Sequence, residues 1–179
     1  LPTGNVNLSA SRSLPDTISL IGMPGAGKST VGVILAKLTG MRFVDTDLDI
    51  QVREDATLQQ ILERHGYQYL RNVEQQVLLE IPLGHAIIST GGSVVYSETA
   101  MQRLGEAGPV VYLAADLASL ERRVAAAPLR GIACDPAQGY PEVFAERTPL
   151  YRRHADIMVD ATAGTADEVA AAILLRLLR

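Results

Sequence analysis

One nine-residue stretch restricts what this chain can fold into more than any other part of its sequence. Residues 22–30 read GMPGAGKST and match the pattern G-x-x-x-x-G-K-[ST] at every fixed position. The run that precedes them, Thr17–Ile21, is rich in β-branched residues and is typical of a buried strand. Apolar residues at i, i+3, i+4 and i+7 follow, the spacing of a helix: Val31, Ile34, Leu35 and Leu38. Strand, glycine-rich turn and helix together favour a parallel sheet covered by helices.

Short β-branched runs alternate with helical spacings along the rest of the chain. Five runs are predicted strands, namely residues 17–21, 42–45, 86–89, 110–113 and 156–159. One apolar stripe runs from Leu70 to Ile81 and is ended by Pro82, and a largely apolar helix is predicted over residues 166–178. The alternation predicts an α/β fold, a three-layer sandwich with a five-stranded parallel sheet. In such sheets ligands bind beyond the carboxyl ends of the strands.

Length and composition fit one compact domain. The chain has 179 residues, and 47% of them are hydrophobic, which is enough for a single core. Residues 1–16 show neither the helical nor the strand period of apolar residues. We expect a flexible N-terminal tail there and a single domain over residues 17–179. Residues 125–140 (AAAPLRGIACDPAQGY) hold two prolines and two glycines between helical segments. This predicts a long, exposed loop that can move as a lid.

The chemistry of residues 22–30 is that of a phosphate-binding loop. Glycines let successive backbone N–H groups surround a diphosphate, and the following helix adds the positive end of its dipole. Lys28 would neutralise the β- and γ-phosphates, and the Ser29 hydroxyl would ligate Mg²⁺. The alternative is a glycine-rich turn with an exposed lysine. The complete motif in its required context favours a nucleoside triphosphate with Mg²⁺, bound by Gly25, Ala26, Gly27, Lys28, Ser29 and Thr30.

Acidic residues follow the second predicted strand, where residues 43–47 read FVDTD. If the strand continues, alternation places Asp45 and Asp47 on one side at its carboxyl end. One carboxylate could then hold a water of the Mg²⁺ shell while the other accepts a hydrogen bond from an acceptor hydroxyl. The alternative, which position alone leaves equally open, is that these carboxylates cap a helix beginning near Leu48.

Two arginines and a glycine pair stand at or near other strand ends. Arg71 and Glu74 are spaced i, i+3, which suits either an exposed ion pair or a guanidinium that binds a carboxylate at the edge of a pocket. Gly91 and Gly92 follow the third strand and permit either close approach by a ligand or a simple tight turn. Arg147 is a second guanidinium near the site, or else a charge on a surface helix.

Taken in order, these segments resemble the shikimate kinase family, a branch of the nucleoside monophosphate kinase-like P-loop fold. The resemblance spans most of the chain and is carried by GMPGAGKST, FVDTD, LRNVE, the TGG turn and ERTPLY. It implies ATP-dependent phosphorylation of the 3-hydroxyl of shikimate, a step of aromatic amino acid synthesis, to give shikimate 3-phosphate. The alternatives are a kinase of the same fold for another small hydroxy acid, such as gluconate, and a non-catalytic nucleotide-binding homologue.

The resemblance also implies residue roles. Ser29 and Asp45 would hold Mg²⁺, the second through a water molecule, and Lys28 and Asp47 would be catalytic. Arg122 or Arg123, on the helix before the lid, could stack on adenine, Arg123 being the candidate carried forward; a solvated helix face is the alternative for both. Contacts with the substrate would come from Asp47, Arg71, Gly91, Gly92 and Arg147.

Three positions depart from the pattern of the family. Ser93 stands where a third glycine is usual, and Leu70 replaces the aromatic residue before the arginine. Ala127 precedes Pro128 where the family carries a lid arginine, the one that reaches over the phosphates. We expect Arg130, two residues beyond the proline, to take over this catalytic role.

Charge and cysteine content exclude several other classes. Sixteen Lys and Arg against 20 Asp and Glu give a formal net charge of −4, which argues against a nucleic-acid-binding surface. A single cysteine, Cys134, excludes an intramolecular disulfide and favours the reducing cytoplasm. No apolar run approaches the roughly 18 residues that span a bilayer. We therefore expect a cytoplasmic monomer whose partner is a small-molecule substrate.

Overall fold

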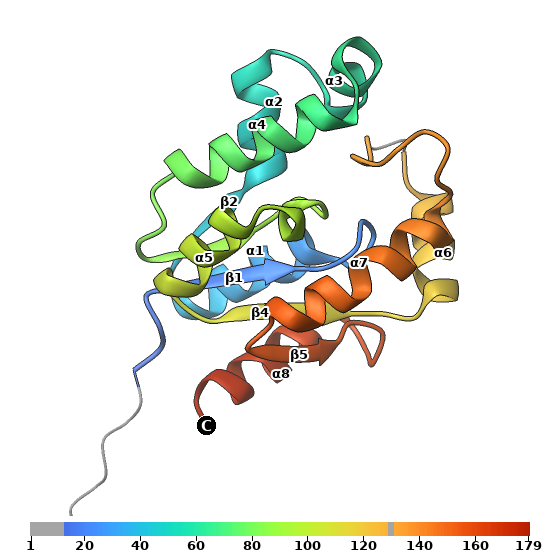
Figure 1. Cartoon of the computed structure of the whole chain (residues 1–179). Helices are drawn as coiled ribbons and strands as arrows, with labels where there is room; N and C mark the ends of the chain where they lie inside the picture. The colour runs from blue at the N-terminus through green and yellow to red at the C-terminus, as the bar shows by residue number, and fades with distance from the viewer. Residues whose placement is uncertain (1–12, 129–130) are drawn as a thin grey trace, which may run out of the picture.

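The computed structural model describes residues 13–128 and 131–179, and it contains the five-stranded parallel sheet that the sequence predicts (Figure 1). The strands stand in the order β2-β3-β1-β4-β5, so β1, which leads into the glycine-rich loop, is central. Strand bounds agree with the predictions within one residue: β1 (Thr17–Ile21), β2 (Arg42–Asp45), β3 (Ala86–Ser89), β4 (Val110–Ala114) and β5 (Ile157–Asp160).

Helices cover both faces of the sheet and complete the three-layer sandwich (Figure 1). Helices α1 and α8 pack together on one face, while α5 contacts β1 and α7 contacts β4 on the other. Helices α2, α3 and α4 pack on one another beside the β2 edge. The helical bounds are α1 (Lys28–Thr39), α2 (Thr46–Glu54), α3 (Leu58–His65), α4 (Tyr67–Glu80), η1 (a 3-10 turn, Val94–Tyr96), α5 (Glu98–Ala107), α6 (Leu117–Ala126), α7 (Tyr140–His154) and α8 (Ala166–Leu177).

The core explains why the strand predictions succeed. Every residue of β1 and β3 is buried, as expected for central parallel strands with helices on both sides. Gly40 takes a left-handed conformation and ends α1 as predicted. A second, smaller apolar cluster lies among α2, α3, α4 and the segment between α6 and α7, and is made of Ile50, Ile61, Leu70, Val73, Val77 and Ala133. This cluster fixes α4 relative to α2, which matters because both helices carry candidate site residues.

The second strand is shorter than the alternation argument assumed, and that argument was wrong. Strand β2 ends at Asp45, and α2 begins at Thr46 rather than near Leu48. The Asp45 side chain accepts a hydrogen bond of 3.1 Å from the backbone N–H of Asp47 and caps the helix. Capping the free N–H groups of a helix start outweighs continuation of the strand at this point. Asp47 therefore reaches the site from the first turn of α2.

The expected tail and lid overlap the ends of the described ranges. Residues 1–12 and Arg130 lie outside them. Asp16, the last residue of the expected tail, already bonds the sheet, because its carbonyl accepts a hydrogen bond of 3.1 Å from the Ala86 N–H. In the expected lid, α6 continues to Ala126 and α7 begins at Tyr140. Ala133 between them is only 6% exposed, so this segment is not uniformly exposed as expected.

Within the described ranges, no helix combines the length and the apolar character needed to cross a bilayer.

Candidate active site

The loop between β1 and α1 has the backbone of a phosphate cradle. Gly25 and Gly27 have φ of 88° and 91°, in the left-handed region that L side chains rarely adopt. Gly27 is the N-cap of α1, so the helix N-terminus opens directly onto the loop. The loop residues Gly25, Gly27, Lys28, Ser29 and Thr30 line a cavity of about 390 Å³, whereas Ala26 is buried behind them.

Lys28 is buried rather than exposed, which removes the alternative of a bare glycine-rich turn with an exposed lysine. Its Nζ donates hydrogen bonds to the carbonyls of Gly22 at 2.8 Å and Met23 at 3.0 Å. Burial lowers the pKa of Lys28 to about 8, although Asp47 and other nearby carboxylates act in the opposite direction. An anion at the cradle would favour the charged form of this lysine, so bound phosphate and the ammonium group stabilise each other.

Ser29 and Asp45 meet beside the cradle. The Ser29 hydroxyl donates a hydrogen bond of 2.6 Å to Asp45 and lies 3.3 Å from the Ser89 hydroxyl. Asp45 thus caps α2, as one of the two interpretations predicts, and faces Ser29 at the same time, while its place in a Mg²⁺ shell stays a prediction. In the described part of the chain, no group of three His, Cys, Asp or Glu residues could hold a metal ion. The pair nevertheless suits Mg²⁺, which takes few protein oxygens and completes its shell with phosphates and water.

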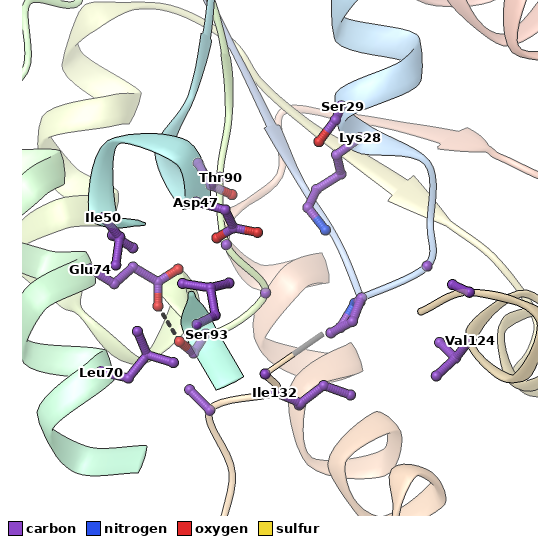
Figure 2. A pocket seen from close by; sticks show the side chains of 18 of the residues that line it. Lys28, Ser29, Asp47, Ile50, Leu70, Glu74, Thr90, Ser93, Val124 and Ile132 are labelled. Carbon is purple, nitrogen blue, oxygen red and sulfur yellow. Dashed lines mark hydrogen bonds between the residues drawn. The ribbon is translucent and has the colours of Figure 1, made fainter. Parts of the chain in front are cut away.

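Asp47 and Glu74 line the same cavity from α2 and α4, and Figure 2 shows both side chains reaching into it opposite Lys28. Glu74 is 4% exposed and accepts a short hydrogen bond from the Ser93 hydroxyl. Burial raises the pKa of Glu74 to about 7. The ion pair between Glu74 and Arg71, one of two interpretations of their spacing, is absent from the described structure. Glu74 bonds Ser93 inside the protein, and Arg71 donates to the Ala133 carbonyl.

Arg71 and Arg147 converge on one backbone oxygen. Arg71 Nε and Arg147 Nη2 donate hydrogen bonds to the carbonyl of Ala133, at 3.1 and 2.8 Å. Both guanidiniums also lie over the ring of Tyr96, at 3.9 and 5.4 Å from its centroid. Arg147 is 1% exposed, so its interpretation as a surface charge is wrong. Two planar cations around a single oxygen form a site suited to a carboxylate.

The glycine pair after β3 lies where a side chain would not fit. A Cβ on Gly91 would collide with Glu74 and lie 3.1 Å from Asp47 Oδ1, and one on Gly92 would lie 3.0 Å from Arg147 Nη1. Close packing against the site, rather than a positive φ, therefore requires these glycines. The Gly91 N–H, expected to bind a substrate hydroxyl, already donates a hydrogen bond of 3.2 Å to the Thr46 hydroxyl.

Comparison with known proteins now identifies the family. The family model for shikimate kinase matches residues 24–178. The chain belongs to the shikimate kinase family. A shikimate kinase of Nitrobacter winogradskyi is 40% identical over 147 residues, which cover 80% of this chain and 68% of the relative. A shikimate kinase of Halorhodospira halophila is 36% identical and covers 89% of this chain and 92% of its own. Among solved structures, shikimate kinase from Acinetobacter baumannii in complex with shikimate has a TM-score of 0.81 at 30% identity, covering 92% of this chain and 93% of its own.

In this shikimate kinase family member Arg123 contacts the phosphate loop, and its role in stacking on adenine stays a prediction. The Arg123 guanidinium lies 3.4 Å from the Gly25 carbonyl and donates a hydrogen bond of 3.0 Å to the Ala161 carbonyl. Arg123 therefore bonds the backbone of the phosphate loop in addition to lining the cavity. Pro128 and Gly131, which flank the segment containing Arg130, also line the cavity.

Sequence reasoning missed two tyrosines that support the site. The Tyr140 hydroxyl donates to the Pro24 carbonyl at 2.5 Å, and the Tyr151 hydroxyl donates to the Gly92 carbonyl. Arg147 lies seven residues after Tyr140 and four before Tyr151, a spacing that puts all three side chains on one face of α7. That spacing was the available signal, but the sequence does not show which loops the face would contact.

Proposed function

We propose that this chain transfers the γ-phosphoryl group of ATP to the 3-hydroxyl of shikimate, giving shikimate 3-phosphate and ADP in aromatic amino acid synthesis. Family membership supports this activity. The observation that carries it is the single cavity in which a triphosphate cradle, the carboxylate of Asp47 and the buried guanidinium of Arg147 meet. A kinase for a small, carboxylated, hydroxylated acceptor requires these three parts together.

The chemical step is mainly alignment and charge neutralisation. Asp47 accepts a hydrogen bond from the acceptor hydroxyl and takes its proton as that oxygen bonds to the γ-phosphorus. The bond between the γ-phosphorus and the bridging oxygen breaks, and ADP leaves with the electron pair. Lys28 neutralises the charge that develops on the phosphates. Ser29, with Asp45 behind it, would hold Mg²⁺, and the ion would supply further positive charge at the phosphates.

The arginine pair supports a carboxylate-bearing acceptor. The Ala133 carbonyl, which accepts hydrogen bonds from Arg71 and Arg147, stands in the structure as a neutral oxygen between two cations. A carboxylate would form stronger, charge-assisted hydrogen bonds with the same donors. Acceptor binding therefore exchanges a lid-segment oxygen for a substrate oxygen.

We further propose that Arg130 supplies the catalytic positive charge of the missing lid arginine. Its neighbours Pro128 and Gly131 line the cavity, which supports this role. The R130A variant should lose at least tenfold in kcat with shikimate, whereas R64A, on an exposed turn of α3, should retain the wild-type value. Equal kcat values for R130A and R64A would rule out this role.

The remaining expectations are a monomer in the cytoplasm with neither nucleic acid nor membrane as partner. They are supported by the formal net charge of −4 and by the single cysteine. Light scattering coupled to gel filtration tests the monomer, and a mass near twice the 19.2 kDa of the chain would contradict it.

A coupled assay for ADP release tests the activity itself. The protein is incubated with ATP, Mg²⁺ and one acid at a time, including shikimate and gluconate. Turnover with shikimate far above the rest supports the proposal. Turnover with gluconate and none with shikimate would assign a different kinase of the same fold, and ATP binding without turnover on any acid would assign a non-catalytic homologue.

A further inference from the structure

Ser93 is buried beside the acceptor cavity and uses its hydroxyl in an unusual way. The residue is 5% exposed, lines the cavity and precedes the turn η1 as its N-cap. A serine at such a position usually accepts a hydrogen bond from the backbone of the following turn. The Ser93 side chain makes no such bond. It donates instead to Glu74 Oε2, as the dashed line in Figure 2 shows.

The two oxygens of Glu74 are left in different situations. Oε2 accepts the hydrogen bond from Ser93. Oε1 is fully buried and has no hydrogen-bond partner in the described part of the chain. It packs against Gly91, where Asp47 also approaches, and the residue lines the cavity. A buried carboxylate oxygen without a donor is unfavourable, so a ligand that brings a hydroxyl to it gains free energy on binding.

We propose that Ser93 is a positioning residue for the acceptor: its hydroxyl holds one oxygen of Glu74 and thereby directs the other at a hydroxyl of the bound acid. This inference depends on the proposed function, because it assigns the hydroxyl donor to the acceptor of the kinase. Ser93 thus replaces the conformational freedom of the glycine usual at this position with a fixed hydrogen bond.

Charge strengthens the geometric argument. Besides Ser93, the groups that face Glu74 are Asp47 from α2, Lys28 from α1 and Arg147 from α7. Burial raises the pKa of Glu74 most, and the hydrogen bond from Ser93 is the largest influence that lowers it. Removing the hydroxyl should therefore raise the pKa of Glu74 further. A carboxylate accepts a hydrogen bond from a hydroxyl better than a carboxylic acid does. As pH falls, acceptor binding by a variant without the Ser93 hydroxyl should therefore begin to weaken at a higher pH than binding by the wild type.

The test is the pH dependence of kcat/KM for shikimate in four variants. S93A and S93G lack the hydroxyl, and S93T keeps it. S97A is the matched control, because the Ser97 hydroxyl bonds the same helix through the neutral Gln75 at 2.8 Å. We expect the acid limb of the profile to move up by about one pH unit in S93A and S93G, the size of one charge-assisted hydrogen bond. It should stay in place in S93T and S97A, and at pH 6 the loss should fall on KM rather than on kcat.

A second measurement reads Glu74 without any turnover. The effect of E74Q on the free energy of unfolding is followed against pH in the wild-type and S93A backgrounds, and its midpoint reports the pKa of Glu74. If the wild type does not phosphorylate shikimate, the proposed function fails, and an unmoved midpoint still refutes the Ser93 bond. A moved midpoint with an unmoved kcat/KM profile also overturns the proposal, because the bond would then exist without positioning the acceptor.

Discussion

Neutralising Glu74 should stabilise the fold at alkaline pH. The side chain is 4% exposed, and burial is the main reason why its pKa rises from 4.5 to about 7. The folded protein therefore holds this proton more tightly than the unfolded chain does. The ionised carboxylate destabilises the folded state fully above pH 7, the effect fades as pH falls, and it is gone below the unfolded pKa of 4.5.

The size of the effect follows from the shift. A displacement from 4.5 to about 7 is worth about 3 kcal/mol at 1.4 kcal/mol per pKa unit. E74Q keeps the volume of the side chain and an oxygen that can accept the Ser93 hydrogen bond, but it cannot ionise. We expect the free energy of unfolding of E74Q to exceed that of the wild type by about 2–3 kcal/mol near pH 8.5. The difference should vanish near pH 4, where Glu74 is protonated in both states.

Urea unfolding followed by circular dichroism at the two pH values measures this difference. E80Q is the matched control, because Glu80 lies on the same helix but is 64% exposed and pairs with Arg53 on the surface. Loss of that pair should cost at most about 1 kcal/mol at either pH. The reasoning is refuted if E74Q and the wild type unfold with equal free energies near pH 8.5, or if their difference is the same near pH 4.

Three further changes test packing, chemistry and nucleotide binding. A Cβ on Gly108 would lie 2.9 Å from the backbone carbonyl carbon of Thr17, so G108A should lose about 1–3 kcal/mol in urea unfolding. G105A should lose nothing, because its Cβ meets nothing within 4 Å. An unfolding curve of G108A that overlaps that of the wild type would contradict the argument. D47N should lower kcat with shikimate by about a hundredfold or more while calorimetry shows ATP still binding, and a near-wild-type kcat would exclude Asp47 as the base. R123K should raise the KM for ATP several-fold but not that for shikimate, and a shift of only the shikimate KM would contradict its place at the phosphate loop.

The sheet could be predicted from the sequence because each strand is a short β-branched run that is separated from the next by a segment with helical spacing. The same local rules predicted the loop and helix start that carry Lys28 and Ser29, since a loop shaped by glycines needs no distant partner. They failed where tertiary contacts decide. The i, i+3 spacing of Arg71 and Glu74 suggested an ion pair, but burial beside Ser93, nineteen residues away, gave Glu74 another partner.

The end of β2 shows a different limit. Alternation predicts that the strand continues after Val44, whereas capping predicts that a helix begins there. The helix forms because Asp45 caps the free N–H groups at the start of α2. The capping box of Thr57 and Gln60 at the start of α3 was a readable signal, and it could have located that helix from sequence. The contacts of Tyr140 and Tyr151 had no such signal, because their acceptors are backbone carbonyls of remote loops.

Helix α7 touches three separate loops along a single face. Tyr140 bonds the phosphate loop, Arg147 bonds the lid segment, and Tyr151 bonds the glycine turn after β3. These loops are far apart in the chain, yet the distances between their anchors are set by one helix with a rise of about 1.5 Å per residue. The loops on the donor side and on the acceptor side of the cavity are thus held at distances that α7 sets. A slight rotation of that helix about its axis would change both halves of the reaction at once.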